Sequence, residues 1–300
     1  MDRRAFLAQL GGLLLVSRRV SAQNAPWQEL EPVALGDGLK LRIRQAQNPG
    51  PVFFIPHNDE NVAVRSVEQF WRTVQPMGTL IELQQFEPSG RNLELRYVYQ
   101  TLQGTRIYAD PNRIYSANLR ITEKKLELGS SETKRCGVAF TTNPGDLGKQ
   151  AARRFQTIGE KITAILRQYL SITDPLIVAM HNNTNDALQA SPAYFSERQF
   201  ELSDRPSAKS RLQNRDLDNF FLATQREDYA RLRKLEWNSI LQLPTAIDDG
   251  SLSIWAAKQQ IRYINIEAEH VLCAQPLPRQ VGLQVQMIAA AVQNISDASR

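Results

Sequence analysis

The sequence is poor in cysteine and contains no long apolar run. Two cysteines in 300 residues are too few for a fold held together by disulfides. No stretch of about 18 apolar residues occurs, so a multi-pass membrane protein is excluded and no transmembrane anchor is expected after residue 22. The content of 15 glycines, 15 prolines and 22% charged residues excludes collagen-like and fully disordered chains and leaves a globular protein.

Several catalytic motifs are absent as well. No Gly-Xaa-Ser-Xaa-Gly sequence occurs, and the 3 histidines do not form a His-Glu-Xaa-Xaa-His pair. Gly148-Lys149 lacks the earlier glycine and the following Ser or Thr of a phosphate-binding loop. The sequence therefore gives no support to a serine hydrolase, a zincin or a P-loop enzyme.

The net charge gives little reason to expect a nucleic-acid partner. Residues 1–22 hold four arginines and one aspartate, so they carry most of the formal charge of +5 and leave about +2 on the rest of the chain. The remaining basic residues, such as Lys124 and Lys125, are interspersed with acidic ones instead of alternating with aromatic residues. We expect no nucleic acid among the partners.

The first 22 residues have the features of an export signal. Arg3 and Arg4 precede a short apolar stretch, and Val-Ser-Ala at residues 20–22 suits cleavage after Ala22. The sequence Arg-Arg-Ala-Phe-Leu at residues 3–7 resembles a twin-arginine signal, whose partner would be the bacterial export machinery. We expect residues 1–22 to be removed and the protein to be periplasmic or secreted. The alternative is a basic, amphipathic N-terminus.

The remaining pattern predicts an α/β fold, with a mixed, mostly parallel central sheet flanked by helices. Short apolar or alternating runs predict strands at residues 51–55, 80–86, 93–99, 105–108, 176–180, 251–257 and 262–266. Helical spacing of apolar residues predicts helices at 64–74, 147–169, 220–235 and 281–295, and residues 182–215 are expected to form a long irregular segment. We expect residues 23–300 to form one domain, in which Cys136 and Cys273 are either paired or two buried thiols.

Two of the histidines directly follow predicted buried strands. His57 follows residues 51–55 and His181 follows 176–180, so both side chains should lie in the crevice at the carboxyl ends of the strands. Glu60, three residues after His57, could join them in a two-histidine, one-glutamate zinc site with a fourth position left for water. Alternatively, His57 caps the next helix with Glu60 in its first turn, or His270 replaces Glu60 as the third ligand.

Along the chain, His57 and Glu60 are followed by Asn112-Arg113, then by His181 and finally by Glu267. This order resembles that of the zinc carboxypeptidases and their amidohydrolase relatives. These relatives include the succinylglutamate desuccinylase and aspartoacylase type, and the chain also resembles a little-described group of bacterial proteins in this superfamily. The resemblance implies a carboxypeptidase-like fold and one zinc ion held by His57, Glu60 and His181. It further implies that Asn112 and Arg113 anchor a substrate carboxylate and that Glu267 is the general base.

Some assignments stay open at this stage. Glu269 lies on the same strand face as Glu267, so either can be the base. Asp59 and His270 are reserve residues, expected to orient a ligand rather than to bind zinc. Arg113 could stabilise a developing oxyanion, or it could form only a structural salt bridge with Asp110.

These observations predict an exported zinc-dependent hydrolase that cleaves an amide or peptide bond. Its substrate would be a small molecule or a peptide, with a free carboxylate as one option. The alternative is a binding or scaffold protein that keeps this fold without turnover.

Overall fold

The computed structural model describes residues 25–134, 137–140, 145–184, 188–203, 216–270 and 278–293. The predicted export signal, Cys136, Cys273 and part of the predicted irregular segment 182–215 lie outside these residues. Within the described residues, none of the helices combines the length and the apolar character needed to span a membrane.

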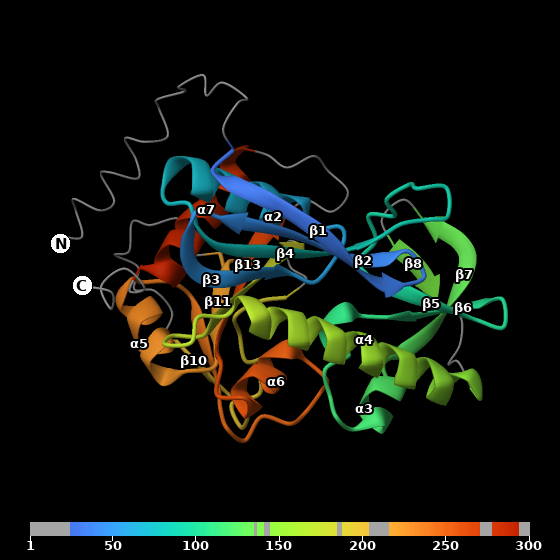
Figure 1. The fold of residues 1–300 in the computed structure, drawn as a ribbon. Helices are drawn as coiled ribbons and strands as arrows, with labels where there is room; N and C mark the ends of the chain where they lie inside the picture. The colour runs from blue at the N-terminus through green and yellow to red at the C-terminus, as the bar shows by residue number, and fades with distance from the viewer. Residues whose placement is uncertain are drawn as a thin grey trace.

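A mixed sheet of nine strands, counted over the described residues, forms the centre of the molecule (Figure 1). In spatial order its strands are β1 (Trp27–Gly36), β2 (Leu39–Ala46), β4 (Met77–Gln85), β3 (Asn48–Ile55), β9 (Leu176–Thr184), β13 (Arg262–His270), β11 (Phe220–Ala223), β12 (Ser239–Gln242) and β10 (Phe200–Leu202). The central strands β4, β3, β9 and β13 are parallel, whereas antiparallel pairs occur toward both edges. This arrangement confirms the predicted fold class.

A second, smaller sheet lies to one side of the first. It consists of β5 (Val98–Leu102), β6 (Thr105–Ala109), β7 (Leu126–Lys134) and β8 (Gly137–Phe140), each antiparallel to its neighbour. The short helices η1 (Pro111–Arg113) and α3 (Leu119–Glu123) follow β6. Asp110, the N-cap residue of η1, lies 3.0 Å from His57, so the chain returns here from the small sheet to the end of β3.

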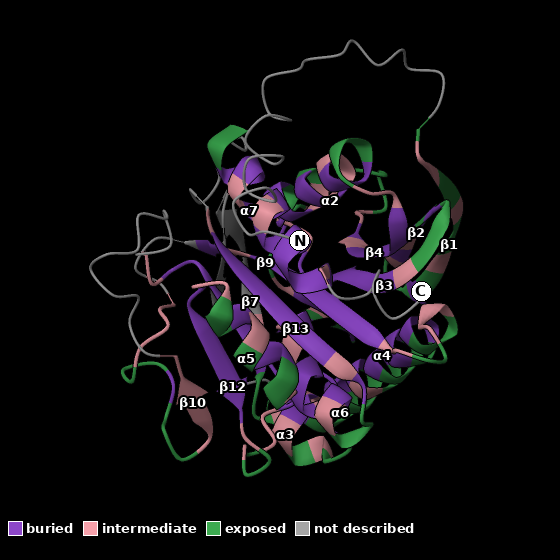
Figure 2. Cartoon of the chain, turned by 90° about the vertical axis from the view of Figure 1, so that its left-hand side faces the viewer, coloured by how far each residue is buried: buried purple, intermediate pink, exposed green. Residues whose placement is uncertain are grey.

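Helices cover both faces of the large sheet because the central strands are apolar on both faces. In β3, Val52 and Phe54 pack in one hydrophobic core, whereas Phe53 and Ile55 pack in the other. The first core includes residues of α4 (Leu147–Tyr169) and α6 (Leu252–Lys258), and the second includes residues of α2 (Asn61–Thr73), α5 (Arg226–Lys234) and α7 (Pro278–Val292). Figure 2 shows β9 and β13 as largely buried strands between these layers. Their carboxyl ends lie at one edge of the sheet, beside that of β3.

Three predicted elements differ from the structure. Residues 220–235 are not one helix: Phe220–Ala223 is strand β11, which is buried between β13 and β12, and only α5 is helical. Residues 251–257 are not a strand but lie largely in α6, because their small and apolar residues cover the sheet from one helical face. The strand predicted at 93–99 begins only at Val98, where pairing with β6 starts.

The prediction also missed β1, β2, β7, β8 and β12, as well as β10, which lies within the segment 182–215 that was expected to be irregular. In β2 the signal was present, since Leu39, Leu41 and Ile43 alternate with polar residues and are buried. Arg44 of β2 is 1% exposed, because its guanidinium forms ion pairs with Glu68 and Glu82.

Candidate metal and hydrolytic site

The loop after β3 places His57 and Glu60 side by side at the edge of the sheet. Pro56 ends the strand, and Glu60 is the N-cap residue of α2. Within the described residues the Glu60 side chain makes no capping hydrogen bond to the helix; its Oε1 atom lies 2.7 Å from His57 Nδ1. The alternative in which His57 caps the helix is therefore wrong. Both side chains are buried, with 1% and 2% of their surface exposed.

His181 completes this group from the neighbouring strand β9. Its Nδ1 atom lies 3.0 Å from Glu60 Oε1, and the two imidazole rings are 5.0 Å apart. One ligand atom from each of His57, Glu60 and His181 lies within 4.8 Å of the others, so these three side chains could hold a metal ion. The structure thus brings together the three residues that the sequence predicts as ligands.

The donor atoms of this group suit a zinc ion. Two imidazole nitrogens and one carboxylate form a common zinc ligand set. Among the described atoms, Glu60 Oε2 and His181 Nε2 are buried with no hydrogen-bond partner. Buried polar atoms are normally hydrogen-bonded, so atoms without a partner in this cluster are consistent with a bound metal ion.

The charges in the group are strongly coupled. Burial favours the neutral form of Glu60, but the adjacent His181 and His57 outweigh it and lower the pKa of Glu60 to about 2. Burial and Arg96 favour neutral His57, but Glu60 and Asp110 outweigh them and raise the pKa of His57 to about 9. In the metal-free protein His57 is therefore protonated at neutral pH.

Asp110 orients His57 from the opposite side. His57 Nε2 lies 3.0 Å from Asp110 Oδ1, so Nδ1 faces Glu60. Burial opposes ionisation of Asp110, but His57 and Arg96 lower its pKa below the usual range. The Asp110 carboxylate also accepts a 2.8 Å hydrogen bond from Asn112 N. From the sequence, Asp110 was named only as an alternative salt-bridge partner of Arg113. Its contact with the His57 ring was not predicted.

Arg96 is a second residue that the sequence did not single out. Its Nη2 atom lies 3.7 Å from Asp110 Oδ2, and its positive charge acts on Glu60, Glu267 and Asp59. It lies between the bridge at Phe86 and strand β5, in a segment without clear periodicity, so no local pattern indicated it.

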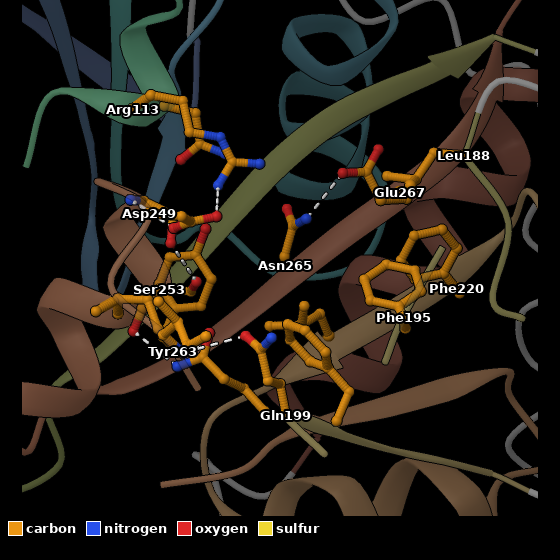
Figure 3. A pocket seen from close by; sticks show the side chains of 17 residues that line it. Arg113, Leu188, Phe195, Gln199, Phe220, Asp249, Ser253, Tyr263, Asn265 and Glu267 are labelled. Atoms are coloured by element: carbon orange, nitrogen blue, oxygen red, sulfur yellow. Dashed lines mark hydrogen bonds and ion pairs between the residues drawn. The ribbon is translucent and has the colours of Figure 1, made fainter. Parts of the chain in front are cut away.

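Glu267 lies on β13 next to His181 on β9. The two residues are direct partners in the parallel pairing, so their side chains project from the same face of the sheet. Glu267 is 8% exposed and its Oε1 accepts a 2.8 Å hydrogen bond from Asn265 Nδ2. It lines a pocket of about 350 Å³ together with Asn112 and Arg113 (Figure 3). This placement suits a general base, and the role itself stays a prediction.

Arg113 pairs with Asp249 rather than with Asp110. Its Nη1 donates to Asp249 Oδ2 at the wall of the pocket, so the predicted alternative of a salt bridge with Asp110 is wrong. Asn112 Oδ1 accepts a hydrogen bond from the backbone of Leu252. The turn that carries Asn112 and Arg113 is thus bonded to the segment from Asp249 to Leu252.

The reserve residues lie around this centre. Glu269 follows Glu267 on the same face of β13. Its backbone N–H donates to Asn219 Oδ1, and its carboxylate lies 3.9 Å from Arg279. Asp59 Oδ1 is buried and, in the described region, unpartnered; burial and Glu60 raise the pKa of Asp59. The backbone of His270 ends β13, but its side chain is outside the described residues.

Comparisons with known proteins show only remote likeness. No family model and no curated protein matches the chain. Among solved structures it is similar to a succinylglutamate desuccinylase from Chromobacterium violaceum, with 11% identity, a TM-score of 0.42, and coverage of 95% of this chain and 73% of that one. It is also similar to the murein-tripeptide amidase from Escherichia coli O157, with 17% identity, a TM-score of 0.41, and coverage of 90% and 92%. A metallo-carboxypeptidase from Burkholderia cenocepacia has 12% identity and a TM-score of 0.36, with 99% and 70% covered. Likeness this remote carries no conclusion about the function of this chain.

Proposed function

We propose that the protein is a zinc-dependent hydrolase that cleaves an amide or peptide bond, with residues 23–300 as its catalytic domain. The observation that supports this most is the convergence of His57 Nδ1 and His181 Nδ1 on Glu60 Oε1, beside the strand position of Glu267. A buried ligand triad and an adjacent carboxylate at the wall of a pocket are the parts that metal-assisted hydrolysis needs.

In this proposal His57, Glu60 and His181 hold one zinc ion. When bound, zinc polarises a carbonyl oxygen and lowers the pKa of a water molecule to about 7. Asp110 fixes the ring of His57, so that Nδ1 keeps its direction during the reaction.

Glu267 accepts the proton of the attacking water and transfers it to the leaving nitrogen. The Asn265 amide holds one oxygen of the Glu267 carboxylate, which limits rotation of the side chain. Asn112 and Arg113 bind a carboxylate of the substrate in the same pocket, where a guanidinium offers two parallel donors. The substrate is then a small molecule or a peptide that carries such a group.

The test combines metal analysis with a screen of amides and peptides. We expect about one zinc ion per chain in the purified protein and hydrolysis that the Glu267→Gln variant loses while it keeps its zinc. A protein that binds zinc but hydrolyses no compound, with or without Glu267, would instead be a binding or scaffold protein on this fold.

We also propose that residues 1–22 direct export. Replacement of both Arg3 and Arg4 by Lys should leave the precursor in the cytoplasm, because the twin-arginine machinery requires the arginine pair rather than positive charge alone. Replacement of Arg18 and Arg19 by Lys is the matched control and should not change export. Normal export of the first variant would exclude this route.

A further inference from the structure

We propose that Arg113 and Asp249 together bind the head group of an α-amino acid, that is, an ammonium and a carboxylate on one carbon atom. This inference rests on the proposed function, since it names the part of the substrate that the same pocket recognises. Both residues line the pocket, and their side chains are 35% and 42% exposed, so the ion pair remains accessible to a ligand.

The position of Asp249 is fixed by the backbone around it. Asp249 Oδ1 accepts a 3.0 Å hydrogen bond from Ser251 N, and Gly250 O accepts one of 2.9 Å from Tyr115 N. Gly250 has a φ of +86° and packs so closely that a Cβ atom would collide with the carbonyl oxygen of Arg113. Most exposed ion pairs lose side-chain entropy when they form, whereas here the Asp249 carboxylate is already held by the backbone of Ser251.

The charge balance of the pocket favours a zwitterionic ligand. Among its described lining residues, Arg113 supplies one positive charge, whereas Asp249 and Glu267 supply two negative ones. A ligand that carries only a carboxylate would compete with Asp249 for Arg113 and would meet two like charges. A zwitterion instead places its carboxylate on the guanidinium and its ammonium on Asp249, so that opposite charges alternate around the cluster.

The place of Glu267 indicates where the scissile bond lies. In Figure 3 the Arg113–Asp249 pair is on one side of the pocket, and Glu267 is on the other, near Leu188 and Phe220. The head group is therefore separate from the bond that reacts. This points to an amide on the side chain of an amino acid whose α-ammonium and α-carboxylate are free. Its hydrolysis consumes one water, breaks the C–N bond and releases a carboxylate and an amine.

The test measures binding, so it does not depend on turnover. The full chain is titrated in a calorimeter with L-norvaline, D-norvaline, pentanoate and butylamine, which share an alkyl chain and differ in the charged groups. We expect one norvaline enantiomer to bind about tenfold or more tightly than pentanoate or butylamine, because a charge-assisted hydrogen bond contributes roughly that factor. In the Asp249→Asn variant this preference should disappear, and pentanoate should bind more tightly than to the wild type.

Asp248→Asn is the matched control. Asp248 is next in the chain and also carries a carboxylate, but it bonds Ser116 and Lys258 and does not line the pocket. This variant should keep the preference for norvaline. Equal affinities for norvaline and pentanoate in the wild type, no binding of any of the four compounds, or the same loss in both variants would overturn the proposal. A protein without zinc or turnover that still prefers norvaline would refute the hydrolase and leave this binding site standing.

Discussion

His181 and Glu267 are direct partners in the pairing of β9 with β13. Neighbouring strands are about 4.8 Å apart, so the Glu267 side chain begins next to a candidate ligand without belonging to the ligand group. Glu269 projects from the same face but pairs with Asn183, which is further along β9 than the candidate ligand His181. This register distinguishes the two carboxylates that the sequence left equivalent.

The first prediction concerns the ligands. Replacing His57, Glu60 or His181 by Ala should lower the zinc content to a small fraction of the wild-type value, because each change removes one of three protein ligands. The measurement is elemental analysis of the folded variants after dialysis against a weak chelator. His270→Ala is the control and should retain zinc; loss of zinc in that variant but not in Glu60→Ala would establish the competing site.

The second prediction concerns the base. Glu267→Gln should reduce kcat by about 10²- to 10⁴-fold on any amide substrate found, since general base catalysis contributes about that factor. The change preserves the size of the side chain, so zinc content should not fall. Glu269→Gln should have a much milder effect, because its carboxylate lies toward Arg279. The opposite ranking would assign the base to Glu269.

The third prediction concerns the metal-free protein as a function of pH. The pKa of His57 is raised from 6.5 to about 9, so folding gains stability from the protonated ring below pH 6.5 and loses it as the pH rises toward 9. The free energy of unfolding in urea, measured after zinc removal, should fall by about 3 kcal/mol over this range. Zinc binding requires a neutral imidazole, so zinc affinity should rise over the same interval.

Two controls accompany this titration. His57→Gln should lose most of the pH dependence, and zinc-loaded protein should lack the decline up to pH 9. If the metal-free wild type becomes more stable as the pH rises from 6.5 to 9, the charge state assigned to His57 is wrong.

The fourth prediction concerns the close approach at the pocket wall. Gly250→Ala should destabilise the protein by roughly 2 kcal/mol or more, because it combines an unfavourable φ with a collision against Arg113 O. Gly90→Ala is a matched control: Gly90 has a φ of +85°, and within the described residues nothing lies within 4 Å of its Cβ position. Thermal unfolding should show a distinctly larger loss for Gly250→Ala. Equal losses would mean that the contact contributes nothing.

The sequence predicted the candidate ligands because their signals are local. Buried runs of apolar residues end at His57 and His181, and parallel strands bring such ends to one edge of a sheet. The ion pair between Arg113 and Asp249 had no local signal, since its partners come from distant turns that only the folded chain joins. Strand β11 was missed because its four residues are buried by neighbours on both sides, which removes the alternation by which a strand is identified.

The central place of β9 also has a consequence for the order of folding and metal uptake. Strand β9 lies between β3 and β13, so the ligand triad is enclosed only when the strand near the C-terminus has docked. A nascent chain that has emerged only as far as β9 would expose both histidines to solvent and to any competing metal. The proposed zinc ion would therefore be bound tightly only by the completed fold, and it would be acquired in the compartment where folding finishes. Under the proposed export in the folded state, that compartment would be the cytoplasm.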